Sequence, residues 1–163
     1  MPFTPFHLGP ALLIALLLFR ILDLPSFLLA SVIVDVEPFL VMLLGLNYPL
    51  HGFFHSFLGG SIVAFVLALA MLKLRPSISR VMSLLRLKQT ISPGRVWTAS
   101  FLGLYIHLLL DSPLYPGMRP FYPLDTNPLL SSSTFIGFEI YTACTICFLT
   151  GIFLYAYRAL RPQ

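Results

Sequence analysis

The chain has 163 residues, of which 58% are hydrophobic and only 10% are charged. Soluble domains carry about 25% charged residues, so this composition excludes a soluble globular protein and predicts an integral membrane protein. A helix of ~20 residues crosses the ~30 Å hydrocarbon core of a bilayer, and the length leaves room for about five such helices. We therefore expect an all-α, polytopic bundle that forms a single integral membrane domain over residues 1–163.

Five apolar stretches follow one another along the chain. They cover residues 6–22, 26–46, 54–74, 96–114 and 135–157. No Lys or Arg precedes the first stretch, and Arg20 lies at its far end, so we interpret it as a retained helix rather than a signal peptide. In the second stretch, Pro38 removes a backbone donor, which predicts a kink or break beside Asp35 and Glu37.

The connection between the third and fourth stretches carries six of the ten basic residues and no acidic residue. These six are Lys73, Arg75, Arg80, Arg86, Lys88 and Arg95. Basic residues concentrate in cytoplasmic loops, so the connection predicts an N-terminus outside the cell and a C-terminus in the cytoplasm. We interpret the basic residues and the net charge of +4 as a topology signal, not as a nucleic-acid or lipid site.

In this orientation all four histidines and five of the six acidic residues fall toward the outer side. Ionisable groups in apolar spans are costly, so their clustering indicates a functional site. His51 and His55 are four residues apart, and so are His107 and Asp111; residues at this spacing share one face of a helix. The candidate metal ligands are His7, Asp35, Glu37, His51, His55, His107 and Asp111.

Imidazole and carboxylate ligands without thiolates suit zinc or another divalent transition metal, although the same side chains could form a proton relay. Asp35, Glu37 and Asp111 would repel one another if all three were ionised in a cavity of low dielectric constant. One divalent cation would leave them with a net negative charge, and two would leave a net positive charge that a bound hydroxide could neutralise. We expect one or two ions, and two-metal sites commonly act on phosphoesters.

Arg119 is the one basic residue that this orientation places outside. A guanidinium binds phosphate or carboxylate through a planar fork of donors, so Arg119 could clamp an anionic substrate; a salt bridge to Asp125 is the alternative. Asp125 itself, in a proline-rich loop, could be a turn residue. Glu139 could face the site or lie at the membrane interface, which leaves its role open.

Three further features have structural interpretations. Asp23 precedes Pro25 and is expected to cap the start of the second helix. Cys144 and Cys147 are expected to be buried small apolar residues. A stripe of small residues in the third stretch predicts a close helix-packing seam.

Four short motifs carry a resemblance to a known family. They are the opening MPFTPFH, the DVE of residues 35–37, the HGFFHS of residues 51–56 and the HLLLD of residues 107–111. In this order they resemble the small prokaryotic inner-membrane proteins known as membrane-bound metal-dependent hydrolases. That family usually has Asp-x-Asp where this chain has Asp35-Val36-Glu37. The resemblance implies a metal site more directly than it implies a substrate.

A more distant likeness is to zinc-dependent phospholipase C and related nucleases. The spacing of His107 and Asp111 matches a His-x-x-x-Asp element of those enzymes, and His7 is similar to their early histidine. Their later His-x-x-x-Glu has no counterpart, because no histidine follows His107. This difference argues against a three-metal copy of that site.

Together these observations predict a metal-dependent hydrolase in the prokaryotic plasma membrane, with its site facing the extracytoplasmic side. Metal-activated water would attack an ester or phosphoester, with Glu37, Asp111 and Arg119 as the catalytic candidates. A lipid or lipid-linked phosphoester is the expected substrate because the site would lie near the membrane surface.

Two alternatives use the same residues. An ion- or proton-coupled transporter needs polar residues through both halves of the bundle, and the inner halves of the spans offer little beyond Ser, Thr and Cys. A non-catalytic scaffold stabilised by a metal would need the same ligands but no open coordination position.

Overall fold

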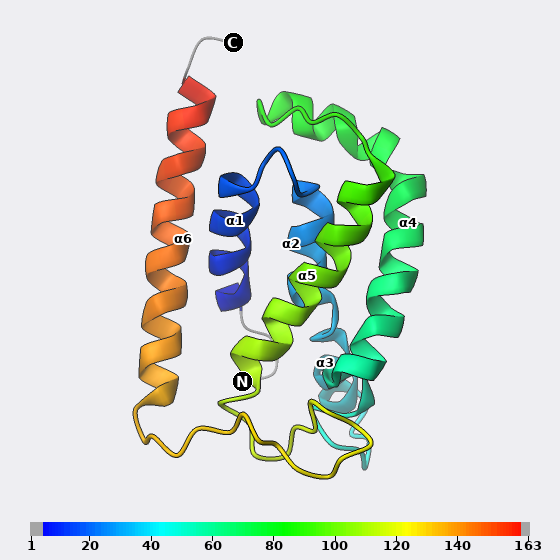
Figure 1. The fold of residues 1–163 in the computed structure, drawn as a ribbon, viewed down its shortest axis with the longest axis vertical. Coiled ribbons are helices and arrows are strands. Elements are labelled where there is room, and N and C mark those ends of the chain that lie inside the picture. The colour runs from blue at the N-terminus through cyan, green and yellow to red at the C-terminus, as the bar shows by residue number, and fades with distance from the viewer. Residues whose placement is uncertain (1–4, 161–163) are drawn as a thin grey trace.

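The computed structural model describes residues 5–160, which form a bundle of helices (Figure 1). All regular secondary structure in this range is helical, which confirms the predicted all-α class. The elements are η1 (Pro5–His7), α1 (Leu8–Leu17), α2 (Leu24–Ile33), α3 (Val36–Leu43), η2 (Phe53–His55), α4 (Phe57–Leu84), α5 (Pro93–Asp111) and α6 (Ile136–Leu160).

Each of the five predicted stretches contains a helix, although the lengths differ. Within residues 5–160, three helical stretches are long and apolar enough to cross a membrane: Leu24–Leu43, Phe57–Leu84 and Ile136–Leu160. The first prediction, 6–22, is longer than the helix, because α1 ends at Leu17. Its 10 residues extend about 15 Å, half of the hydrocarbon core. Beyond α1 the chain turns, with the Leu22 amide bonded to the Leu18 carbonyl, and enters α2.

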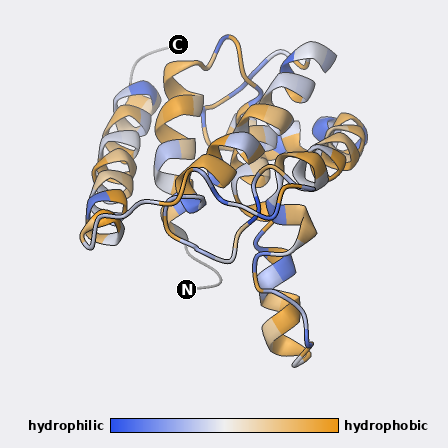
Figure 2. Cartoon of the chain, turned by 60° about the horizontal axis from the view of Figure 1, so that its bottom comes forward, coloured by the Kyte–Doolittle hydropathy of each residue, from blue (hydrophilic) through white to orange (hydrophobic). Residues whose placement is uncertain are grey.

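The second stretch is broken, as Pro38 predicts. Helix α2 ends at Ile33 and α3 begins at Val36, so Asp35 lies in the interruption. Pro38 has no N–H to donate, and the Glu37 amide instead bonds the Val34 carbonyl at 3.0 Å, a tighter turn than the α-helix makes. Helix α3 then projects from the bundle with a largely hydrophobic surface (Figure 2).

Helix α4 corrects the prediction that the basic residues between the third and fourth stretches lie in a loop. It continues to Leu84, so Lys73, Arg75 and Arg80 lie in a helix. Pro76 lies inside this helix, and Figure 1 shows that α4 bends near its upper end. A proline removes one helical hydrogen bond and kinks the helix there, but the helix resumes beyond it. Met82, beyond the bend, packs in one apolar cluster with residues of α1 and α2.

Small residues let the helices approach closely. Gly60, Ala64 and Ala68 form the predicted seam on α4, and the two alanines are fully buried. A Cβ on Gly60 would lie 2.5 Å from Leu104 of α5. A Cβ on Gly103 of α5 would lie 2.7 Å from the Phe27 carbonyl oxygen of α2. These contacts hold α2, α4 and α5 together, and those helices carry or adjoin most of the candidate ligands.

The upper end of the bundle contains a buried charged pair that sequence reasoning missed. Asp23 caps α2 as predicted, because its Oδ2 accepts from the amide of Ser26 at 3.3 Å and from its hydroxyl at 2.6 Å. Its Oδ1 also accepts from Nε of Arg75 at 2.6 Å, and both side chains are buried. The prediction that Arg75 lies in the connecting loop is wrong, because α4 continues through this position and carries the side chain inward against the start of α2.

Candidate metal centre

The predicted polar residues meet at the lower end of the bundle in Figure 1, where separate elements bring them together. His7 ends η1, and His55 ends η2. Asp35 occupies the break between α2 and α3, where no regular helix holds the backbone. His107 and Asp111 lie on the last turns of α5. The polar side chains are thus supplied by helix ends and interruptions.

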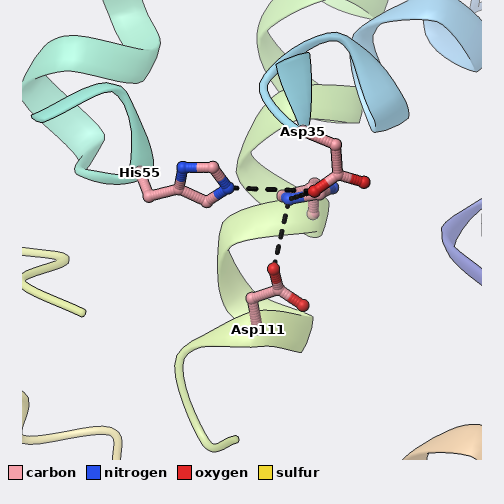
Figure 3. A group of neighbouring side chains, drawn as sticks. Asp35, His55 and Asp111 are labelled. Carbon is pink, nitrogen blue, oxygen red and sulfur yellow. Dashed lines mark ion pairs between the residues drawn. The ribbon is translucent and has the colours of Figure 1, made fainter. Parts of the chain in front are cut away.

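Four of these residues form a compact buried group. Asp35, His55, His107 and Asp111 each offer one ligand atom, and these atoms all lie within 4.8 Å of one another. Figure 3 shows Asp35, His55 and Asp111 reaching from three directions toward a common point. Both histidines are completely buried, and the two aspartates are 4% and 3% exposed. The geometry could hold one cation at the centre.

Hydrogen bonding determines where His107 carries its proton. Its Nδ1 lies 2.8 Å from the backbone oxygen of Ser31, and a carbonyl oxygen can only accept. Nδ1 therefore holds the proton, and in the neutral ring Nε2 presents a lone pair. That Nε2 lies 3.3 Å from Oδ2 of Asp111 and 3.5 Å from Oδ1 of Asp35, yet it has no hydrogen-bond partner among the described residues.

His55 repeats this arrangement. Its Nδ1 lies 2.7 Å from Oε2 of Glu37, so an ionised Glu37 accepts the proton on that nitrogen. Its Nε2 faces Oδ1 of Asp35 at 3.8 Å and, in the part of the chain that the structure describes, makes no hydrogen bond. A lone pair that faces carboxylates is unfavourable unless a cation lies between them. In their neutral forms, both rings thus present an acceptor nitrogen to the same oxygen of Asp35.

His7, the last residue of η1, lies near both aspartates of the group. Its Nε2 lies 3.0 Å from Oδ1 of Asp111, and its Nδ1 lies 3.9 Å from Oδ2 of Asp35. The centroids of the His7 and His107 rings are 4.1 Å apart, and His7 is 6% exposed. The structure therefore brings His7 to the same buried group, with one ring nitrogen near each aspartate.

His51 lies between the buried group and an open cavity. Its Nε2 is 3.9 Å from Oδ2 of Asp111, and its ring stacks on Tyr115 at a centroid distance of 3.9 Å. Burial, and then the nearby His55, lower the pKa of His51 to about 4, so the ring is neutral at pH 7. His51 and Arg119 both line a cavity of about 340 Å³ that also includes Tyr122. His51 therefore lies beside both this cavity and Asp111 of the buried group.

The remaining candidates lie farther out. Glu37 contacts the ring nitrogen of His55 that points away from the central group. Arg119 forms the ion pair with Asp125 that was the alternative to a substrate clamp, at 2.8 Å between Nη1 and Oδ1. Both side chains of that pair are more than half exposed. Glu139 is exposed in the first turn of α6.

Two contacts of the site had no clear signal in the sequence. The Ser31 carbonyl that binds His107 belongs to the backbone, which no residue type reveals. The stacking of Tyr115 on His51 joins residues from two different loops, so no helical spacing relates them. Of the two cysteines, Cys144 is buried as predicted, whereas Cys147 is only partly buried.

Comparison with known proteins gives the chain a family. The sequence model of the family described as YdjM inner membrane protein matches residues 1–162. The chain belongs to this family. No curated protein and no solved structure matches it. Membership in the YdjM inner membrane protein family, together with the long apolar helices, supports a membrane location.

The residues present fit a metal ion. Zinc and similar cations take neutral imidazole nitrogens and carboxylate oxygens, and ligating histidines usually donate their other N–H to a carboxylate or a backbone carbonyl. His55 and His107 do so, toward Glu37 and Ser31. Their unpartnered Nε2 atoms and the facing Asp35 and Asp111 supply the donors for a cation.

Proposed function

We propose that this protein is a membrane-embedded, metal-dependent hydrolase that acts on an ester or phosphoester of a lipid or lipid-linked substrate. One observation carries the proposal. The Nε2 atoms of His55 and His107, which have no hydrogen-bond partner among the described residues, face Asp35 while their Nδ1 protons are donated elsewhere. This arrangement suits one divalent cation, and the ligand types favour zinc.

In this proposal, the position of each residue determines its role. Asp35, His55, His107 and Asp111 would hold the ion, and His7 would complete either this site or a second one. A divalent cation there supplies a Lewis acid and acidifies water. Glu37 would hold the His55 ring in orientation through Nδ1, as carboxylates commonly do for ligating histidines.

His51 and Arg119 line the cavity from which a substrate would approach. His51, neutral at pH 7, could accept a proton near Asp111. Arg119 would exchange its exposed partner Asp125 for an anionic group of the substrate, because exposed ion pairs are weak. The two residues would thus serve proton transfer and substrate binding.

The apolar surroundings support a lipid substrate. A cavity of about 390 Å³ lies beside Glu37 and is lined mainly by apolar side chains, among them Val36, Leu40, Val41 and Phe54. It could accept an acyl chain next to the metal site. The basic residues at the opposite end of the bundle favour a site that faces the extracytoplasmic side.

Metal analysis and hydrolysis measured on the same preparations test this proposal. Purified protein should contain one or two zinc ions per chain, located by anomalous scattering near Asp35, and should hydrolyse a lipid phosphoester in nanodiscs. Asp111→Asn and His107→Ala should lose both properties, because each removes a donor atom of the buried group. Glu139→Gln, which removes an exposed carboxylate, is the matched control and should keep both.

The outcomes separate the alternatives. Unchanged metal content and hydrolysis in both site variants would refute the proposal. Metal binding without hydrolysis of any ester or phosphoester would instead favour the metal-stabilised scaffold.

A further inference from the structure

The end of the bundle opposite the candidate metal centre holds an unusual arginine. Arg75 is completely buried at the bend of α4, one residue before Pro76. A guanidinium offers five N–H donors, and the Nε donor bonds Asp23. Neither Nη1 nor Nη2 has a hydrogen-bond partner among the described residues. A buried charged donor group without an acceptor is unfavourable, so an acceptor is to be expected there.

In this structure Asp23 does not supply that acceptor. Its Oδ1 is bonded to Nε of Arg75, and its Oδ2 accepts twice from Ser26. Gln89, a buried amide at this end, is bonded elsewhere. Its Oε1 accepts from the Leu24 amide at 3.0 Å, and its Nε2 donates to two carbonyl oxygens of the α1–α2 turn.

Arg75 lines a cavity whose other charged residues are basic. The cavity has a volume of about 440 Å³, and Arg80 and Lys88, both exposed, lie on its wall. Ser83 adds a hydroxyl donor, whereas the Ser79 hydroxyl already donates to the Pro76 carbonyl. No acidic residue is among the lining side chains. An arginine fork beside two further cations and a hydroxyl is a chemical match for phosphate oxygens.

We propose that this cavity binds a phosphate group, with Nη1 and Nη2 of Arg75 as its central donors. Arg80 and Lys88 close the site from the surface side. The segment of α4 beyond the bend exposes Val81, Leu84 and Leu85, which suits a position at the membrane interface. The phosphate of an anionic lipid headgroup is therefore one source, and free phosphate is the other. This site does not depend on the function proposed for the metal centre.

Binding of two probes to the purified full chain tests the proposal. The probes are inorganic phosphate and phosphatidylglycerol in mixed micelles, with phosphatidylcholine micelles as the neutral reference, and the readout is calorimetric titration. We expect one binding event per chain. Arg80→Gln combined with Lys88→Gln should weaken it by about tenfold, since each basic residue near a lipid surface contributes to anion binding. This variant leaves the Arg75–Asp23 pair intact.

Two further variants make the test specific. Lys73→Gln combined with Arg95→Gln removes two basic residues of the same region that do not line the cavity, and it should change the affinity by less than about twofold. Arg75→Lys keeps the charge beside Asp23 but removes the planar fork, so it should weaken binding while the protein stays folded.

The results distinguish the two sources. Binding of phosphatidylglycerol but not of inorganic phosphate identifies a lipid headgroup site, and binding of inorganic phosphate identifies a site for free phosphate. If neither probe binds, or if the Lys73–Arg95 variant loses as much affinity as the Arg80–Lys88 variant, the proposal is wrong.

Discussion

At the scale of single residues, the case for a metal centre depends on which ring nitrogen of each buried histidine carries the proton. His107 and His55 each donate a proton from Nδ1 to a fixed acceptor, Ser31 in one case and Glu37 in the other. When the rings are neutral, the opposite nitrogens are acceptors that face Asp35, and a cation between them would relieve the conflict. The same reasoning applies to Arg75 at the other end of the bundle, where the two Nη groups are buried donors without an acceptor among the described residues.

Replacement of Glu37 tests whether this residue orients His55 or binds the metal itself. In Glu37→Ala, His55 loses its 2.7 Å acceptor, and we expect zinc affinity to fall by about 10–100-fold at unchanged stoichiometry. Glu37→Gln keeps an acceptor oxygen for His55, so we expect it to lose less zinc affinity than Glu37→Ala. Competition titration with a zinc chelator measures both values. A loss of stoichiometry equal to that of His55→Ala would instead make Glu37 a direct ligand.

At the scale of helices, the site depends on how closely α2 and α5 pack. The His107–Ser31 hydrogen bond joins these two helices. Gly103, one turn of α5 before His107, allows their close approach at Phe27 and Ala30. Because backbone and a short side chain form the contact, neither can move away alone. Helix packing and ligand geometry are therefore coupled in this protein.

Gly103→Ala tests this coupling. The added Cβ would lie 2.7 Å from the Phe27 carbonyl oxygen, so we expect the free energy of unfolding to fall by about 1–3 kcal/mol and zinc affinity to decrease. Gly94→Ala, in the first turn of the same helix, meets nothing within 4 Å and serves as the control. Thermal unfolding in detergent compares the two. Equal melting temperatures of the two variants would show that the close approach of α2 and α5 does not determine the stability of the protein.

At the scale of the whole molecule, the two ends of the bundle differ in chemistry. Imidazoles and carboxylates gather at the lower end in Figure 1, and basic residues from the end of α4 to the start of α5 gather at the other. The described chain also starts near the lower end and finishes at the upper end. The positive-inside rule then predicts that the metal centre faces away from the cytoplasm.

Labelling of single cysteines tests this orientation. In a background of Cys144→Ala and Cys147→Ala, we place a cysteine at exposed Thr126 in one variant and at exposed Lys88 in another. An impermeant maleimide should label Thr126→Cys in right-side-out membrane vesicles and should label Lys88→Cys after permeabilisation alone. The reverse pattern would place the metal centre on the cytoplasmic side.

Composition and local rules were sufficient for much of this protein. The low charge content predicted a helical membrane protein, and apolar stretches located a helix in each of five regions. Pro38 predicted the break at Asp35, and the Asp23–Pro25 pattern predicted the start of α2. These features depend on interactions within a few residues, which a sequence displays directly.

Contacts between distant segments needed the tertiary structure. Helix α4 continues past the end of the predicted span and carries Arg75 to Asp23, 52 residues away in the chain, where a basic loop was expected. The proton positions on His55 and His107 follow from Glu37 and from a backbone carbonyl 76 residues away. The sequence by itself determined which polar residues are available in an apolar chain. Only the packing of the helices decided which of them face one another, because burial and partner geometry arise between elements and not within them.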